Sequence, residues 1–167
     1  MKNRFISCVG PLTKILMSDG SYMEAANLQP GMLVSAKEPT SFAEGTYQIK
    51  SVTVERPPVM SIQFDHVNFV CSTMHTFFMR TEIEENNTIN HIWFRAEDLK
   101  VGDIVGGHTV LSITNNNAIH SEETFLRFPE DATELEIQKG EVYEVADLIR
   151  IEVDVVGTFI AEGMLSS

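Results

Sequence analysis

The amino-acid sequence predicts an all-β domain. Short runs of alternating apolar and polar residues, or of β-branched residues, recur at intervals of roughly eight to twelve residues. Turn-forming pairs such as Asp19-Gly20, Pro30-Gly31 and Asn86-Asn87 separate these runs. Only two stretches have the pattern of a helical turn, Met23–Leu28 and Ala96–Lys100, and both are short. Many short strands with few helices are typical of a β-barrel or a β-sandwich.

The expected strands follow one another along almost the whole chain. In order they are Thr13–Met17, Met32–Ala36, Tyr47–Glu55, Met60–Phe64, Val67–Cys71, Thr76–Thr81, Ile89–Phe94, Ile104–Val105, Thr109–Ile113, Ile149–Val156 and Thr158–Ala161. Residues 115–140 interrupt this pattern because they are acidic, rich in turn residues and only weakly periodic. We expect this stretch to be an inserted excursion, with a short helix around Ala132–Gln138.

One sequence pattern occurs twice. Ala25-x-x-Leu28-x-x-Gly31-x-x-Val34 recurs as Ala96-x-x-Leu99-x-x-Gly102-x-x-Val105. In each copy a helical turn with apolar residues at i and i+3 is stopped by glycine and leads into a strand. A chance match of a common corner is one explanation. The other is a duplication, which predicts two β-rich subdomains related by a pseudo-twofold, with 19–34 and 93–105 as equivalent corners.

The composition fits a single acidic globular domain. Among 167 residues there are 24 acidic and 12 basic side chains, a net charge of −12, and 43% of the residues are hydrophobic. Such a surface repels phosphate groups, so we expect neither a nucleic-acid partner nor binding to an anionic membrane. The N-terminus lacks the apolar core of a signal peptide, and no apolar run is long enough to cross a bilayer. We therefore expect a cytoplasmic or virion protein.

The two cysteines, Cys8 and Cys71, are expected to be free thiols in a reducing compartment. A zinc site made of Cys8, His66, Cys71 and His75 is an alternative, but the spacing of these residues fits no standard short ligand pair. In a strand, positions 71 and 75 share a face, whereas position 66 does not. We therefore expect no metal and no small-molecule cofactor.

Several motifs in order together resemble the Hint domain, the self-processing module shared by hedgehog proteins, inteins and bacterial intein-like proteins. They are Cys8, Thr13, Asp19-Gly20, the tail Leu28–Val34, the segment Ser72–His75, the run Asp98–Asp103 and the closing GTFIAEGMLSS. The resemblance covers the chain from Cys8 onward, apart from the stretch 115–140. It implies an all-β horseshoe of two pseudo-twofold-related subdomains over residues 8–167, with residues 1–7 as a short N-terminal extension.

The resemblance implies a self-processing reaction at the Ser7–Cys8 peptide bond. The Cys8 thiol would attack the Ser7 carbonyl and convert the amide into a thioester, which is an N-to-S acyl shift. His75 matches the family's histidine, which contacts the scissile amide nitrogen and can protonate it as it leaves. Ser72 stands where the family usually has threonine and keeps the hydroxyl, and Thr73 is a second candidate for that role.

The catalytic acid is less clearly marked in the sequence. An acidic residue assists the cysteine in many members of the family, and the candidates here are Asp154 and then Asp103. Cys8 and His75 also have ordinary alternatives, because a free cysteine is often a buried, inert thiol. A histidine that lies between Met74 and Phe77 in sequence can be a hydrogen-bonded core residue.

The chain departs from the family pattern at several positions. It ends in Ser166-Ser167 instead of His-Asn, and Gly157 stands near the place of the histidine that assists asparagine cyclisation. Met32 replaces the aspartate of the first corner, and Ser7 stands where glycine often precedes the cysteine. Intein splicing is therefore not expected. Because only seven residues precede Cys8, a processing domain here would have little to release.

Three functions remain open from the sequence. The first is a processing-deficient Hint-like domain used as a structural module, with protein partners in a larger particle such as a phage tail or baseplate. The second is an autoprocessing domain that forms a thioester at Cys8 and yields it to water, a thiol or another nucleophile. The third is an unrelated β-barrel binding module whose likeness to the family is accidental.

Overall fold

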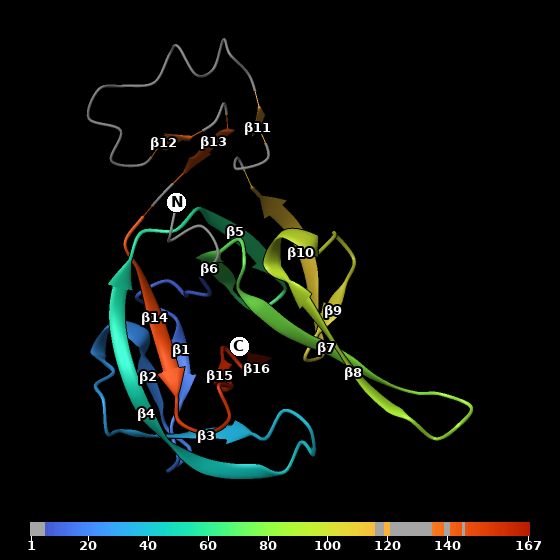
Figure 1. Cartoon of the computed structure of the whole chain (residues 1–167). Helices are drawn as coiled ribbons and strands as arrows, with labels where there is room; N and C mark the ends of the chain where they lie inside the picture. Colours follow the sequence, from blue (N-terminus) through green and yellow to red (C-terminus); the bar gives the residue numbers. More distant parts are fainter. Residues whose placement is uncertain (1–5, 116–118, 121–134, 139–140, 145) are drawn as a thin grey trace.

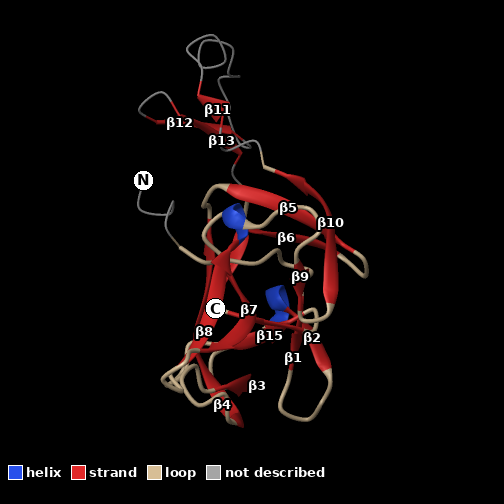
Figure 2. Cartoon of the chain, turned by 90° about the vertical axis from the view of Figure 1, so that its right-hand side faces the viewer, coloured by secondary structure: helices blue, strands red, loops and turns tan. Residues whose placement is uncertain are grey.

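The computed structural model describes residues 6–115, 119–120, 135–138, 141–144 and 146–167. Within these residues the chain is built of antiparallel strands and two single turns of 3-10 helix, as Figures 1 and 2 show. No helix in this part of the chain is long and apolar enough to cross a membrane. The predicted all-β class is confirmed.

The strands of the described residues form four sheets. The six-stranded sheet has the order β2 (Tyr22–Glu24), β1 (Lys14–Leu16), β15 (Phe159–Ala161), β16 (Met164–Ser166), β7 (Thr76–Ile83) and β8 (Ile89–Arg95). The four-stranded sheet has the order β6 (Asn68–Ser72), β5 (Val59–Phe64), β10 (His108–Thr114) and β9 (Ile104–Val105). One three-stranded sheet joins β14 (Leu148–Val153), β4 (Glu44–Glu55) and β3 (Leu33–Lys37), and another joins β11 (Ile119–His120), β13 (Glu141–Glu144) and β12 (Leu135–Gln138).

The other three sheets enclose the main apolar core of the described residues, and a smaller cluster lies around Cys8. The inward residues of β5 and β14 alternate with less buried ones, as expected of strands with one face on the core. Phe64, Phe69 and Phe77 are fully buried, and their rings meet edge to face at centroid distances of 5.1–6.3 Å. In Figure 1 the bent strand β4 wraps one side of the molecule, whereas the β7–β8 hairpin projects from the other.

The two copies of the repeated pattern adopt the same backbone structure. Each contains one 3-10 turn, η2 (Ala25–Asn27) or η3 (Ala96–Asp98), between extended residues. The glycines that follow, Gly31 and Gly102, have φ values of +94° and +96°, which only glycine adopts readily. These angles explain why glycine recurs at this position.

The hydrogen bonds of the two corners also correspond. The Ala25 N–H donates to the Thr13 carbonyl at 2.8 Å, and the Ala96 N–H donates to the His75 carbonyl at 2.6 Å. The Gly31 N–H reaches the Ile49 carbonyl at 2.8 Å; its counterpart Gly102 reaches Val110 at 2.9 Å. His75 therefore occupies in one half the place that Thr13 occupies in the other.

Some local predictions need correction. Met23–Leu28 is not one helical turn, because Tyr22–Glu24 pairs with Lys14–Leu16 as strand β2 before η2 begins. The helix expected around Ala132–Gln138 is wrong for Leu135–Gln138, which forms β12 and pairs with Glu141–Glu144. Pairing with a neighbouring strand outweighs the weak local helical pattern there. Residues 132–134, and most of the excursion expected at 115–140, lie outside the described residues.

Candidate functional site

The segment that carries Cys8 is held between two strands. Val9 forms bridges with Cys71 in β6 and with Ile149 in β14, and its N–H donates to the Ile149 carbonyl at 3.0 Å. The Ser72 N–H donates to the Cys8 carbonyl at 3.0 Å. These bonds fix the backbone on the C-terminal side of the Ser7–Cys8 peptide bond.

Ser72 holds the amide of this peptide bond. Its side chain is fully buried at the end of β6. The Ser72 Oγ accepts the N–H of Cys8 at 2.8 Å and donates to the Ile6 carbonyl at 2.8 Å. One hydroxyl therefore satisfies backbone groups on both sides of Ser7, at the position predicted from the sequence.

His75 lies on the other side of Ser7, in an apolar environment. It is fully buried, and its ring contacts those of Phe69, Phe77 and Phe159 at centroid distances of 4.8–6.1 Å. Burial lowers the pKa of its imidazole to about 3. His75 is therefore neutral at physiological pH.

The tautomer of His75 follows from its hydrogen bonds. The Ser7 Oγ lies 3.0 Å from His75 Nδ1 and donates to the Ser167 carbonyl at 2.6 Å. Because a hydroxyl has one hydrogen, Ser7 must accept the second bond, so Nδ1 carries the imidazole proton. The Nε2 atom is buried without a hydrogen-bond partner among the described residues.

The Cys8 thiol faces a different environment from His75. It is 1% exposed and packs with Val59 and Leu148 in a small apolar cluster. Adjacent side chains of an extended segment point to opposite sides, so Ser7 faces His75 while Cys8 faces this cluster. Burial, and after it the negative charge of Glu55, raises the pKa of the Cys8 thiol, whereas the positive charge of Arg150 lowers it; together they bring the pKa to about 12.

An open cleft of about 500 Å³ lies beside the site. Ser7, Arg150, Asp154 and Ser167 are among the residues that line it, whereas Cys8 is not among its described lining residues. Asp154 is exposed, and its backbone N–H donates to the Gln48 carbonyl at 2.8 Å. The predicted acid therefore shares the cleft with Ser7 but not with the thiol.

Thr73 and Asp103 have structural contacts. The Thr73 N–H donates to the Pro58 carbonyl at 3.1 Å, and its carbonyl accepts the N–H of Glu97 at 3.1 Å. These bonds tie the end of β6 to η3. The Asp103 carboxylate accepts the Lys100 N–H at 2.8 Å within the second corner. Neither residue forms a hydrogen bond with Cys8 or His75 within the described part of the chain.

The sequence did not reveal the roles of the Ser7 hydroxyl and the Ser167 carbonyl. Both groups are brought together only by the fold, since 160 positions separate them. The replacement of the usual glycine by serine before Cys8 was the available signal. The alternative zinc set is not assembled either, because His66 lies on an exposed turn while Cys8, Cys71 and His75 are buried.

Comparisons with known proteins agree on the fold. No protein-family model and no curated protein matches the sequence. Among solved structures, a DnaB intein from Synechocystis sp. PCC 6803 is similar with a TM-score of 0.62 and 11% identity, covering 96% of each chain. The gp41-1 intein has a TM-score of 0.55 and 18% identity, covering 96% of this chain and 97% of its own.

A bacterial intein-like domain from Clostridium thermocellum has a TM-score of 0.57 and 17% identity, covering 96% of each chain. At such identities the likeness shows the fold alone. The chain has the all-β Hint fold, with two related halves, that the sequence motifs predicted.

Proposed function

We propose that this chain is a Hint-fold domain that has kept the framework of a self-processing site without the reaction, and that it serves as a structural module. Its partners would be proteins of a larger particle, such as a phage tail or baseplate, in the cytoplasm or the virion. The absence of the reaction is supported by the burial of the Cys8 thiol between Val59 and Leu148.

Three features of the site oppose an acyl shift in this arrangement. With a pKa of about 12, the Cys8 thiol would be ionised in only about one molecule in 10⁵ at pH 7. The Ser72 hydroxyl gives its hydrogen to Ile6, so it accepts from the Cys8 amide and does not protonate it. His75 donates to the Ser7 hydroxyl, and its low pKa leaves it without a second proton.

Intact-mass spectrometry of the purified chain tests the absence of processing. The chain is incubated with and without dithiothreitol or hydroxylamine, which cleave thioesters. We expect an unchanged mass in every condition, for the native chain and for the Cys8→Ala and Cys71→Ala variants. Loss of the residues before Cys8, prevented by Cys8→Ala but not by Cys71→Ala, would refute this part of the proposal.

The exposed strand edges support a role in assembly. β2 and β8 are the two outer strands of the six-stranded sheet, and each has one edge that pairs with no strand in the described chain. Such an edge can pair with a strand of another protein. The projecting β7–β8 hairpin (Figure 1) also carries Ile83 and Ile89, which are direct cross-strand neighbours and are 70% and 59% exposed. Contact surfaces contain contiguous exposed apolar side chains, and we propose that a partner covers this pair.

Reconstitution with the other proteins of the particle tests this part. We expect co-purification of an identified particle protein with the native chain, and its loss in the variant Ile83→Asp/Ile89→Asp. Val101→Asp, which replaces another exposed apolar residue, is the matched control. A chain that stays monomeric beside every particle protein would contradict an assembly role.

Autoprocessing remains the second candidate because Ser72 hydrogen-bonds the amide of the expected scissile bond. In that reaction the thiol attacks the Ser7 carbonyl, the amide nitrogen leaves with a proton, and a thioester replaces the peptide bond. Water or another thiol would then release the acyl group and regenerate the Cys8 thiol. This function requires Cys8 to rotate out of its apolar cluster, and a mass loss in the experiment above would select it.

A further inference from the structure

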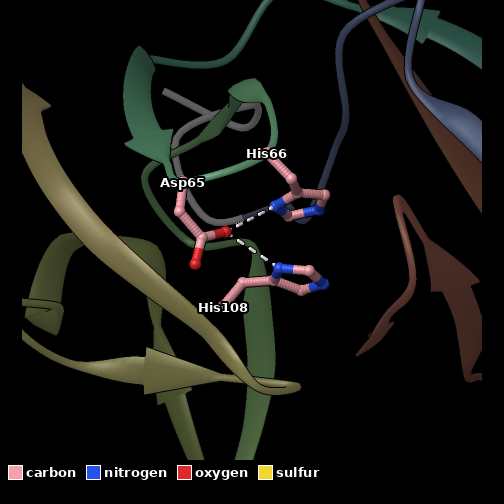
Figure 3. Close-up of side chains that lie close together, drawn as sticks. All are labelled: Asp65, His66 and His108. Atoms are coloured by element: carbon pink, nitrogen blue, oxygen red, sulfur yellow. Dashed lines mark hydrogen bonds and ion pairs between the residues drawn. The ribbon is translucent and has the colours of Figure 1, made fainter.

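A second cluster of reactive side chains lies outside the Ser7–Cys8 site. Asp65, His66 and His108 gather at the turn between β5 and β6 and at the start of β10, as Figure 3 shows. Their ligand-type atoms all lie within 4.8 Å of one another. The Asp65 N–H donates to the Thr109 carbonyl at 3.1 Å, which joins the turn to β10.

The Asp65 carboxylate is oriented by the backbone. Its Oδ2 accepts the Thr109 N–H at 3.1 Å, so Oδ1 is directed at the two imidazoles. The distances from Oδ1 are 2.9 Å to His108 Nδ1 and 3.4 Å to His66 Nδ1. The hydrogen bonds from Thr109 and His108 hold the pKa of Asp65 below its usual value, so this oxygen is anionic at neutral pH.

The hydrogen bond of His66 on its other side defines its tautomer. His66 Nε2 lies 2.8 Å from the Glu162 carbonyl, which can only accept, so Nε2 carries the proton of the neutral ring. The Nδ1 lone pair of His66 then faces the anionic Oδ1 of Asp65. Two electron-rich atoms oppose each other there, and a cation between them would remove the repulsion.

This arrangement matches the surroundings of a metal ligand. Histidine ligands usually donate their second ring N–H to a carbonyl or carboxylate, as His66 does to Glu162. Two ligands on one tetrahedral zinc ion are separated by about 3.3 Å, given metal–ligand distances of about 2.0–2.1 Å. The separations of 2.9 and 3.4 Å around Asp65 Oδ1 are close to this value.

We propose that Asp65, His66 and His108 bind one divalent transition-metal ion of the zinc class, through two imidazole nitrogens and one carboxylate oxygen. Water would complete the coordination of this open site. The two rings stack at 3.5 Å with planes 19° apart, and the His108 Nδ1–H donates to Asp65. Binding therefore requires the His108 proton to leave Nδ1 and both rings to turn until their lone pairs converge. Exposures of 28% and 33% leave His66 and His108 room to turn.

Metal binding would stabilise the C-terminal hairpin. All three ligands belong to the four-stranded sheet, and the His66 ring also hydrogen-bonds the Glu162 carbonyl between β15 and β16. An ion that fixes the His66 ring would therefore strengthen the hydrogen bond that joins this sheet to the C-terminal hairpin. Stabilisation follows from preferential binding to the folded chain.

Titration of the EDTA-treated, dialysed chain with ZnCl₂ by calorimetry tests the site. We expect one equivalent bound, with at least tenfold weaker binding in His66→Gln and in His108→Gln, and a higher melting temperature with zinc in the native chain only. Asp65→Asn should also weaken binding. His91→Gln is the matched control, because His91 lies outside the cluster and should leave the affinity unchanged.

Cobalt(II) identifies the donor atoms. We expect a visible spectrum of nitrogen and oxygen ligation without the thiolate charge-transfer band, and no change in the variant Cys8→Ala/Cys71→Ala. Absence of zinc binding by the native chain, binding only at millimolar zinc, or binding that persists in His66→Gln/His108→Gln would each overturn the proposal.

Discussion

At the residue scale, Ser72 is the most constrained side chain of the candidate site. Its hydroxyl is the partner of both the Cys8 N–H and the Ile6 carbonyl, and it is completely buried. A buried backbone group that loses its partner costs about 1–3 kcal/mol. Ser72 therefore contributes to stability whether or not the chain processes itself.

Replacement of Ser72 by alanine should lower the free energy of unfolding by about 1–3 kcal/mol. Chemical denaturation measured by circular dichroism checks this. Ser72→Thr keeps the hydroxyl and is the matched control, with a smaller expected loss. An alanine variant as stable as the native chain would show that water replaces the hydroxyl without cost.

The buried His75 makes stability depend on pH. In the unfolded chain its pKa is near 6.5, and in the folded chain it is lowered to about 3 by burial. The unfolded state binds the proton first as the pH falls, so the contribution of His75 is complete above pH 6.5 and is lost progressively toward pH 3. The loss is about 1.4 kcal/mol per pH unit within that window.

Unfolding free energies of the native chain and of His75→Gln between pH 7 and pH 5 measure this effect. We expect a steeper fall for the native chain, because the carboxylates that titrate in the same range are common to both. Parallel curves for the two proteins would mean that folding does not lower the pKa of His75.

At the element scale, the two 3-10 corners organise the halves of the fold. Their caps, their glycine conformations and their hydrogen bonds correspond, although few residues in them are identical. The corners were predictable from the sequence because each one needs a glycine and apolar residues at a fixed spacing within a few positions. The strand Tyr22–Glu24 was not, since its pairing with β1 has no local signal stronger than the helical pattern that overlaps it.

Alanine at Gly31 or Gly102 should destabilise the domain by about 1–2 kcal/mol each, because a Cβ is unfavourable at positive φ. No atom near Gly102 would clash with the added carbon, so the effect there isolates the backbone conformation. Thermal unfolding checks it, with Lys100→Ala as an exposed control in the same corner. Loss at only one glycine would show that the two corners differ in energy despite their shared geometry.

At the scale of the whole molecule, the fold and part of the site follow from the sequence. The order of motifs predicted Ser72 and His75 near the Ser7–Cys8 bond, and in the structure Ser72 accepts the Cys8 amide whereas His75 contacts the Ser7 hydroxyl instead of the amide nitrogen. The orientation of Cys8 could not be predicted, because it depends on Val59 and Leu148, which come from distant strands. The same holds for His66 and His108, which meet only because β10 pairs with β5.

Whether the Cys8 thiol can react depends on how these distant strands pack around it. Family motifs mark which side chains lie near the bond, whereas the core around them decides whether the thiol is ionised and whether it faces the carbonyl. Here Ser72 and His75 lie beside the Ser7–Cys8 bond, but the Cys8 side chain points into an apolar cluster. These features support the proposal that the chain is a stable scaffold and does not cleave itself.

The reactivity of Cys8 as a function of pH tests this account most directly. The chain is alkylated with iodoacetamide, and modification of Cys8 is quantified by peptide mass spectrometry in the native state and in urea. With a pKa raised to about 12, the native rate should rise about tenfold per pH unit from pH 7 to pH 10 without a plateau, whereas the unfolded chain should level off near pH 9. A native rate that already levels off at or below pH 8 would show a poised nucleophile and contradict the account.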